Sequence, residues 1–112
     1  MKDKTIIGLI ETITIFGKKE NIEIKARIDT GATKSSINQK LSERLDLGPI
    51  IGTKIVKSAH GTSTRPLVEA TIKISNKEVK GEFSIANRNH MKYEVLIGQN
   101  ILKQGFLIDP EK

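Results

Sequence analysis

The sequence of 112 residues has no cysteine, and its aromatic residues are limited to three phenylalanines and one tyrosine. Without cysteine the protein can form no disulfide, no thiolate metal site and no cysteine nucleophile, and the reducing cytoplasm fits this composition best. Aromatic side chains provide the stacking surfaces that many nucleic-acid-binding proteins use. Their scarcity argues against a nucleic-acid partner, although the net charge is +6.

Two further absences limit the location and the chemistry. No apolar stretch approaches the roughly 18 residues that cross a bilayer, and residues 1–4 lead into a strand-like segment, so we expect a soluble, unprocessed protein without a membrane partner. The chain has neither a Gly-x-x-x-x-Gly-Lys-[Ser/Thr] loop for ATP nor a His-Glu-x-x-His zinc motif. His60 and His90 both lie in polar segments and are expected to be solvated. The sequence therefore predicts no metal and no cofactor.

The length fits one domain over residues 1–112. Alternation of apolar and polar residues, with many β-branched side chains, predicts a mainly β chain. Short helices are expected over residues 39–45, with Ser35, Ser36 and Asn38 as candidate caps and Gly48-Pro49 as the stop, and over 99–104, capped by Gly105. The expected strands cover residues 5–10 and 12–16 as one bent strand or a pair, then 22–28, 50–57, 67–74, 79–86, 93–97 and 106–109.

The motif Asp29-Thr30-Gly31-Ala32 closes the alternating run 22–28 and thus places a carboxylate at the end of a strand, in a tight turn. Glycine in such a turn permits a close backbone approach, and the threonine hydroxyl can form a hydrogen bond across it. These are also ordinary turn residues. The motif gains weight from the apolar segment Ile97-Gly98-Gln99-Asn100-Ile101-Leu102, about 70 residues later.

In this order, and with a glycine-tipped hairpin between them, the two motifs resemble those of retropepsin-type aspartic proteases. The resemblance extends over nearly the whole chain and implies a closed, mainly β retropepsin-like barrel with one or two short helices. A closer resemblance is to the cellular retropepsin-like family labelled ATP-dependent zinc protease. It rests on the segment Ile28 to Ser36, on Arg65-Pro66, and on Asn87-Arg88-Asn89-His90-Met91.

The resemblance implies an aspartic endopeptidase. Hydrolysis needs two carboxylates that share a proton, and one Asp-Thr-Gly per chain then requires a homodimer in which Asp29 of each subunit is catalytic. The resemblance also implies five residues that support the active site: Thr30, Gly31, Ala32, Gly98 and Asn100. It further implies a flap over residues 58–66 that holds a peptide or protein substrate through Ser58, Ala59, His60, Gly61 and Thr62.

Three details refine this expectation. Ala32 cannot donate a hydrogen bond to the carboxylate, so we expect optimal activity near about pH 5 to 6 rather than 3. Retroviral members carry an arginine after the glycine of the second motif and an acid after Asp-Thr-Gly-Ala, and this chain has Gln99 and Thr33 there. The terminal strand, residues 106–109, is expected to pair across the dimer.

Other functions remain open at this point. A related domain that has lost catalysis would keep the groove and the flap as a peptide-binding module. The family label also suggests an accessory domain for an ATP-dependent ligase-type partner. The basic net charge leaves a nucleic-acid-binding domain as a further alternative, which would bind with a steep salt dependence.

Overall fold

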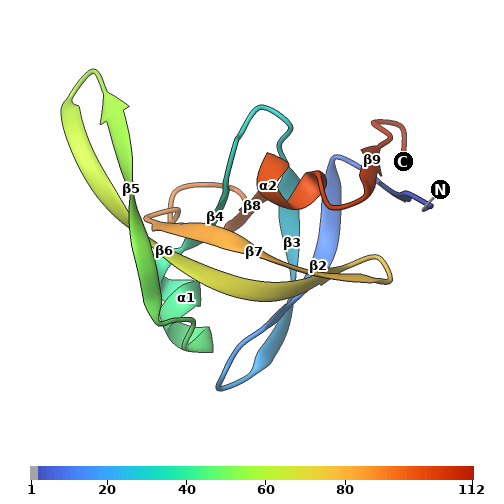
Figure 1. Cartoon of the computed structure of the whole chain (residues 1–112), viewed down its shortest axis with the longest axis horizontal. Helices are drawn as coiled ribbons and strands as arrows, with labels where there is room; N and C mark the ends of the chain where they lie inside the picture. The colour runs from blue at the N-terminus through green and yellow to red at the C-terminus, as the bar shows by residue number, and fades with distance from the viewer. Residues whose placement is uncertain (1–2) are drawn as a thin grey trace.

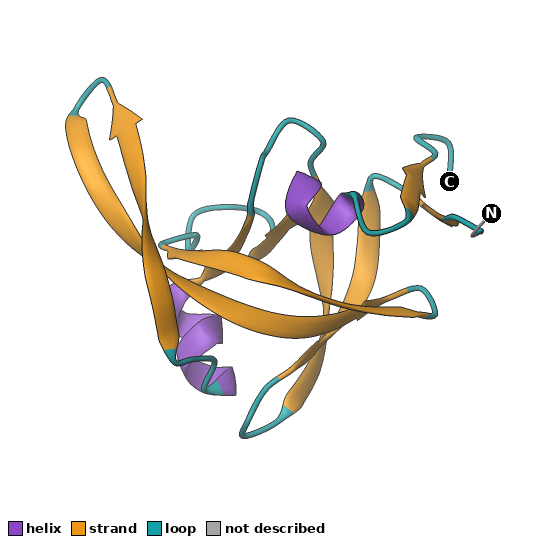
Figure 2. Ribbon diagram, viewed as in Figure 1, coloured by secondary structure: helices purple, strands orange, loops and turns teal. Residues whose placement is uncertain are grey.

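The computed structural model describes residues 3–112, which fold mainly into strands with two short helices (Figures 1 and 2). In chain order the elements are β1 (Thr5–Ile7), β2 (Ile10–Phe16), β3 (Asn21–Ile28), β4 (Ser35–Asn38), α1 (Gln39–Leu45), β5 (Ile50–Ser58), β6 (Gly61–Ile74), β7 (Lys77–Ala86), β8 (Val95–Ile97), α2 (Gln99–Leu102) and β9 (Phe106–Ile108). No helix within this described range is long and apolar enough to cross a bilayer.

Six of the strands close into a barrel. The order β2-β3-β8-β4-β7-β6 returns to its start because β2 also pairs with β6. The pairs β3–β8 and β4–β7 are parallel, and the other pairs in the ring are antiparallel. The predicted closed, mainly β barrel of retropepsin type with two short helices is therefore confirmed.

Alternating apolar side chains fill the barrel. Ile13 and Ile15 of β2 lie in register with Ile74 and Ile72 of β6, and all four are at most 1% exposed. Phe83 of β7 is the largest fully buried side chain. Branched aliphatic residues suit the pleated inner face of a barrel, which explains how a chain so poor in aromatic residues fills its core.

Strand β5 and the first half of β6 form a long hairpin that projects from the barrel (Figure 1). The sequence predicted a polar turn over residues 58–66, and this is wrong. The strands stay paired from Thr53↔Pro66 to Ser58↔Gly61, so only Ala59 and His60 form the turn. A two-residue turn is enough because Gly61 adopts φ of 118°, which a glycine tolerates.

The cap assignments before α1 need correction. Ser35 and Ser36 belong to β4, whose four residues are all buried. Asn38 precedes the helix, but its side chain makes no capping bond and instead accepts the N–H of Arg88 at 2.9 Å. The helix ends at Leu45, and the next residue, Asp46, has left-handed backbone angles, so the helix stops before Gly48-Pro49 is reached.

The two chain ends meet beside the barrel. Strand β9 pairs in parallel with β1, with Ile6 opposite Leu107. One edge of β9 is therefore occupied by β1, so only its other edge can pair across a dimer. That pairing stays a prediction. Helix α2 is one turn long, shorter than the expected 99–104, and Gly105 follows with φ of 99°.

Candidate active site

Asp29 follows the last residue of β3, at the end of the barrel where β8 also ends. Its backbone N–H donates to the carbonyl of Ile97 at 2.8 Å, which extends the parallel pairing by one residue. Its carboxylate Oδ1 accepts the N–H of Gly31 at 2.9 Å, and its carbonyl accepts the N–H of Ala32 at 3.3 Å. The turn thus holds a half-exposed carboxylate in a defined orientation.

The segment Gly98 to Asn100 braces this turn from behind. The N–H of Gln99 donates to the carbonyl of Ala32 at 2.8 Å, and the N–H of Asn100 donates to that of Thr33 at 3.1 Å. The side-chain amide of Gln99 donates to the carbonyl of Thr30 at 2.8 Å. Three hydrogen bonds therefore fix the carbonyls of Thr30, Ala32 and Thr33 in the loop that carries Asp29.

The brace requires a glycine at position 98. A Cβ there would lie 2.4 Å from the carbonyl oxygen of Lys34 and 2.8 Å from that of Ala32. Both neighbours are backbone atoms, which cannot move aside as the end of a flexible side chain could. The close approach of the two segments thus depends on the missing side chain.

Ser35 connects the brace to the barrel. Its hydroxyl accepts the N–H of Gly98 at 2.9 Å and donates to Oδ1 of Asn100 at 2.9 Å. The amide nitrogen of Asn100 in turn donates to the carbonyl of Glu82 on β7 at 2.9 Å. Sequence analysis missed this role, because a serine before a helix resembles a cap and no local pattern indicates a partner more than 60 residues away.

Arg88 lies near Asp29 and near two other arginines. Arg88 is half-buried, and its Nε–H donates to the carbonyl of Tyr93 at 3.0 Å. Burial lowers the pKa of Arg88, the charges of Arg65 and Arg27 lower it further, and Asp29 raises it. The guanidinium group of Arg88 therefore lies within electrostatic range of both other arginines and of Asp29. Sequence analysis found Arg65 and Arg88 only as part of a resemblance and assigned them no role.

The residues expected in the flap lie on the β5–β6 hairpin. Ser58, Ala59, His60, Gly61 and Thr62 form the exposed tip of the β5–β6 hairpin. The Ser58 hydroxyl accepts the N–H of His60 at 3.3 Å and organises the turn. The tip stands apart from the loop between β3 and β4 that carries Asp29 (Figure 1). Within one chain, the structure does not bring these residues to the carboxylate.

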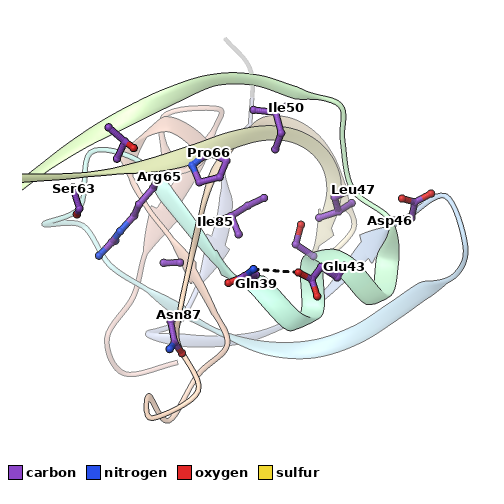
Figure 3. Close-up of a pocket in the computed structure, with 13 residues that line it drawn as sticks. Gln39, Glu43, Asp46, Leu47, Ile50, Ser63, Arg65, Pro66, Ile85 and Asn87 are labelled. Carbon is purple, nitrogen blue, oxygen red and sulfur yellow. Dashed lines mark hydrogen bonds between the residues drawn. The ribbon is translucent and has the colours of Figure 1, made fainter.

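A pocket of about 750 Å³ lies between α1 and the base of the hairpin (Figure 3). Its walls include the apolar side chains of Leu47, Ile50, Pro66 and Ile85. Arg65 lies on the side opposite Leu47 (Figure 3). Asp29 does not line this pocket.

The two histidines belong to no cluster of possible metal ligands in the described part of the chain. His60 lies in the hairpin turn and His90 in the loop after β7, and both are exposed. Across residues 3–112 no three His, Cys, Asp or Glu side chains gather at one point. A zinc site needs about that many convergent ligands.

Comparisons with known proteins agree with this architecture. Residues 15–104 match the family model described as "gag-polyprotein putative aspartyl protease". A Legionella pneumophila protein of unknown function has a similar structure, with a TM-score of 0.68 and 22% identity over 96% of this chain and 95% of that one. The simian foamy virus protease gives 0.63 and 21% over 84% and 91% of the two chains. The EIAV protease, solved with the inhibitor HBY-793, gives 0.65 and 19% over 84% of each.

One curated relative differs in kind. The "Probable alpha-L-glutamate ligase" of Desulfotalea psychrophila is 30% identical over 78% of this chain. The match occupies only 24% of that protein, so this chain spans about a quarter of its length.

Proposed function

The chain belongs to the gag-polyprotein aspartyl protease family, and we propose from this that it is an aspartic endopeptidase whose reactive centre is formed by Asp29 of two identical subunits. One carboxylate would take a proton from the attacking water while the other donates a proton to the carbonyl oxygen of the scissile bond. Two carboxylates at contact distance hold one proton between them, because two like charges so close together are costly.

The observation that carries this proposal is the bracing of the Asp29 turn. Three of its carbonyls are fixed by Gln99 and Asn100, and its carboxylate is oriented by the N–H of Gly31. Catalytic groups need such support, since small misplacements cost large factors in rate. A turn with no task beyond connecting two strands has no need of a rigid, half-exposed carboxylate.

Exposed apolar side chains support the homodimer. Ile6 and Leu107 are 51% and 53% exposed and lie opposite each other on the β1–β9 pair. Leu9 and Ile10, which follow β1, are also exposed. Burial of such side chains against a symmetry-related copy would stabilise a twofold dimer.

The hairpin supports peptide binding. Strand β5 is the last strand in the order of its sheet, so its outer edge can accept an extended peptide as an added strand. Ile50, Ile51 and Ile55 on β5 are each at least half-exposed. We propose that Ser58, Ala59, His60, Gly61 and Thr62 at the tip close over the substrate once two subunits meet.

The test is digestion of a peptide library by the wild type, by Asp29→Asn and by the matched control Asp46→Asn, whose carboxylate is exposed after α1 at left-handed backbone angles that asparagine tolerates. We expect Asp29→Asn to lose at least about a thousandfold in kcat/KM while the control retains activity. A pepstatin-type inhibitor should block the wild type and a chelator should not. Cleavage that survives Asp29→Asn but stops with the chelator would overturn the proposal.

A second candidate is supported by the ligase relative. The chain matches one quarter of that protein, which favours a module that binds a peptide for an ATP-dependent ligase-type partner without cleaving it. In that case Asp29→Asn would leave peptide binding and cellular function intact. The first experiment therefore separates the two candidates.

A further inference from the structure

Three arginines from separate elements group near Asp29. Arg65 and Asn87, the residue before Arg88, line the same pocket (Figure 3), and Arg88 lies within electrostatic range of the other two arginines and of Asp29. Arg27 lies two residues before Asp29, so the alternation of β3 places both side chains on the same face, while Ile28 between them is buried. Arg65 comes from the base of the β5–β6 hairpin, where it lies in register with Lys54. Arg88 comes from the loop after β7, and its Nε–H is fixed on the carbonyl of Tyr93.

These charges are not neutralised within the chain. Over residues 3–112 the ion pairs are Lys34–Glu82 and Arg44–Glu20, and neither involves the three arginines. The neighbouring carboxylate of Glu94 accepts the side-chain amide of Asn38 instead. Asp29 supplies one negative charge against three positive ones. Arg65 and Arg88 are half-buried, and a half-buried guanidinium group without a paired anion is costly unless a ligand supplies that anion.

We infer that Arg27, Arg65 and Arg88 form a cationic subsite beside Asp29 that binds the carboxylate of a glutamate or aspartate side chain in the substrate. The inference rests on the proposed function and names its substrate class, acidic peptides. A planar guanidinium fork matches a carboxylate in two parallel hydrogen bonds, which favours arginine over lysine for this task. The three arginines form a compact group around Arg88 instead of the extended stripe that a nucleic-acid backbone requires.

The test compares peptide pairs that differ by Glu or Gln at one position within about four residues of the scissile bond. At one or more positions we expect the Glu peptide to be cleaved with a kcat/KM at least about tenfold higher, the range for a charge-assisted hydrogen bond. The ratio should fall towards one in Arg88→Gln and Arg65→Gln. Lys73→Gln removes a charge from the exposed far end of β6 and should leave the ratio unchanged.

Arg88 also holds a loop carbonyl, so Arg88→Gln can impair folding. Arg27→Gln, at an exposed position, and Arg88→Lys, which keeps the charge but loses the fork, provide independent tests. Both should lower the Glu preference at least threefold at unchanged melting temperature. Equal cleavage of Glu and Gln peptides at every position would overturn the subsite.

Binding separates this inference from the proposed function. The same fluorescent peptides are titrated into Asp29→Asn, and anisotropy reports their Kd values. Tighter binding of the Glu peptide that depends on Arg65 supports the subsite even if the wild type cleaves nothing. Cleavage without a Glu preference would leave the peptidase standing and refute the subsite. Binding of a single-stranded oligonucleotide through Arg65, with no affinity for the acidic peptides, would also refute it.

Discussion

Gly98→Ala is the sharpest test of how the turn is held. The added Cβ would lie 2.4 Å from the carbonyl oxygen of Lys34, 2.7 Å from its carbonyl carbon and 2.8 Å from the carbonyl oxygen of Ala32. All three are backbone atoms, so the turn and the segment before α2 must separate. That separation stretches the bonds from Gln99 to Ala32 and from Asn100 to Thr33.

The cost follows from these contacts. Forcing extra volume into a packed site costs about 1–3 kcal/mol. The loss of one or two of the hydrogen bonds adds about 1 kcal/mol each. We therefore expect Gly98→Ala to lower the free energy of unfolding by about 2–5 kcal/mol, and the melting temperature by roughly 10 °C or more for a chain of this size. Peptide cleavage should fall more steeply than stability, because the shift displaces Asp29 itself.

Gly52→Ala is the matched control. Its Cβ would meet only Cδ1 of Leu67, at 3.8 Å, an ordinary contact. We expect its free energy of unfolding to change by less than about 1 kcal/mol. Urea and thermal unfolding are measured at equal protein concentration, since the stability of a dimer depends on it. If Gly98→Ala were as stable and as active as Gly52→Ala, the argument for a close backbone brace would be refuted.

Three further predictions follow from the same region and from the chain ends. Replacing both Ile6 and Leu107 by aspartate should raise the Kd of the proposed dimer at least about a hundredfold, because each buried side chain contributes about 1.5–3 kcal/mol. Analytical ultracentrifugation measures this change. Equal masses of the wild type and the variant at every concentration would contradict it. Ser35→Ala should cost about 1–3 kcal/mol in urea unfolding because the N–H of Gly98 loses its partner, and an unchanged midpoint would show that the bond is dispensable. The wild type is expected to cleave best at about pH 5 to 6, and Ala32→Ser should lower this optimum, since a hydroxyl that donates to a carboxylate favours its charged form. A wild-type optimum below about pH 3 would contradict the reasoning.

The barrel strands were predictable because their period is local. In β2, β3, β6 and β7 apolar residues alternate with polar ones, and the structure places a strand over each predicted run. Strand β4 was missed for the opposite reason. All four of its residues are buried although three are polar, so the segment shows no alternation, and its serines resemble helix caps.

The candidate site was predictable only in part. Two sequence motifs identified Asp29 and Gly98, because each carries a distinctive glycine. The arginine cluster could not be found in this way, since Arg27, Arg65 and Arg88 lie on three elements that tertiary structure alone brings into range. Their proximity depends on barrel closure, which a local pattern does not encode.

The neutral residues Gln99 and Thr33 now have a physical explanation. The retroviral pattern joins these positions by a charged pair, whereas here the amide of Gln99 binds the carbonyl of Thr30 and the carbonyl of Thr33 accepts the N–H of Asn100. A brace made of neutral groups is indifferent to ionisation and is little weakened by salt. It also adds no second carboxylate next to Asp29. The positive field of Arg27, Arg65 and Arg88 is thus left for Asp29 and for whatever anionic side chain a substrate brings.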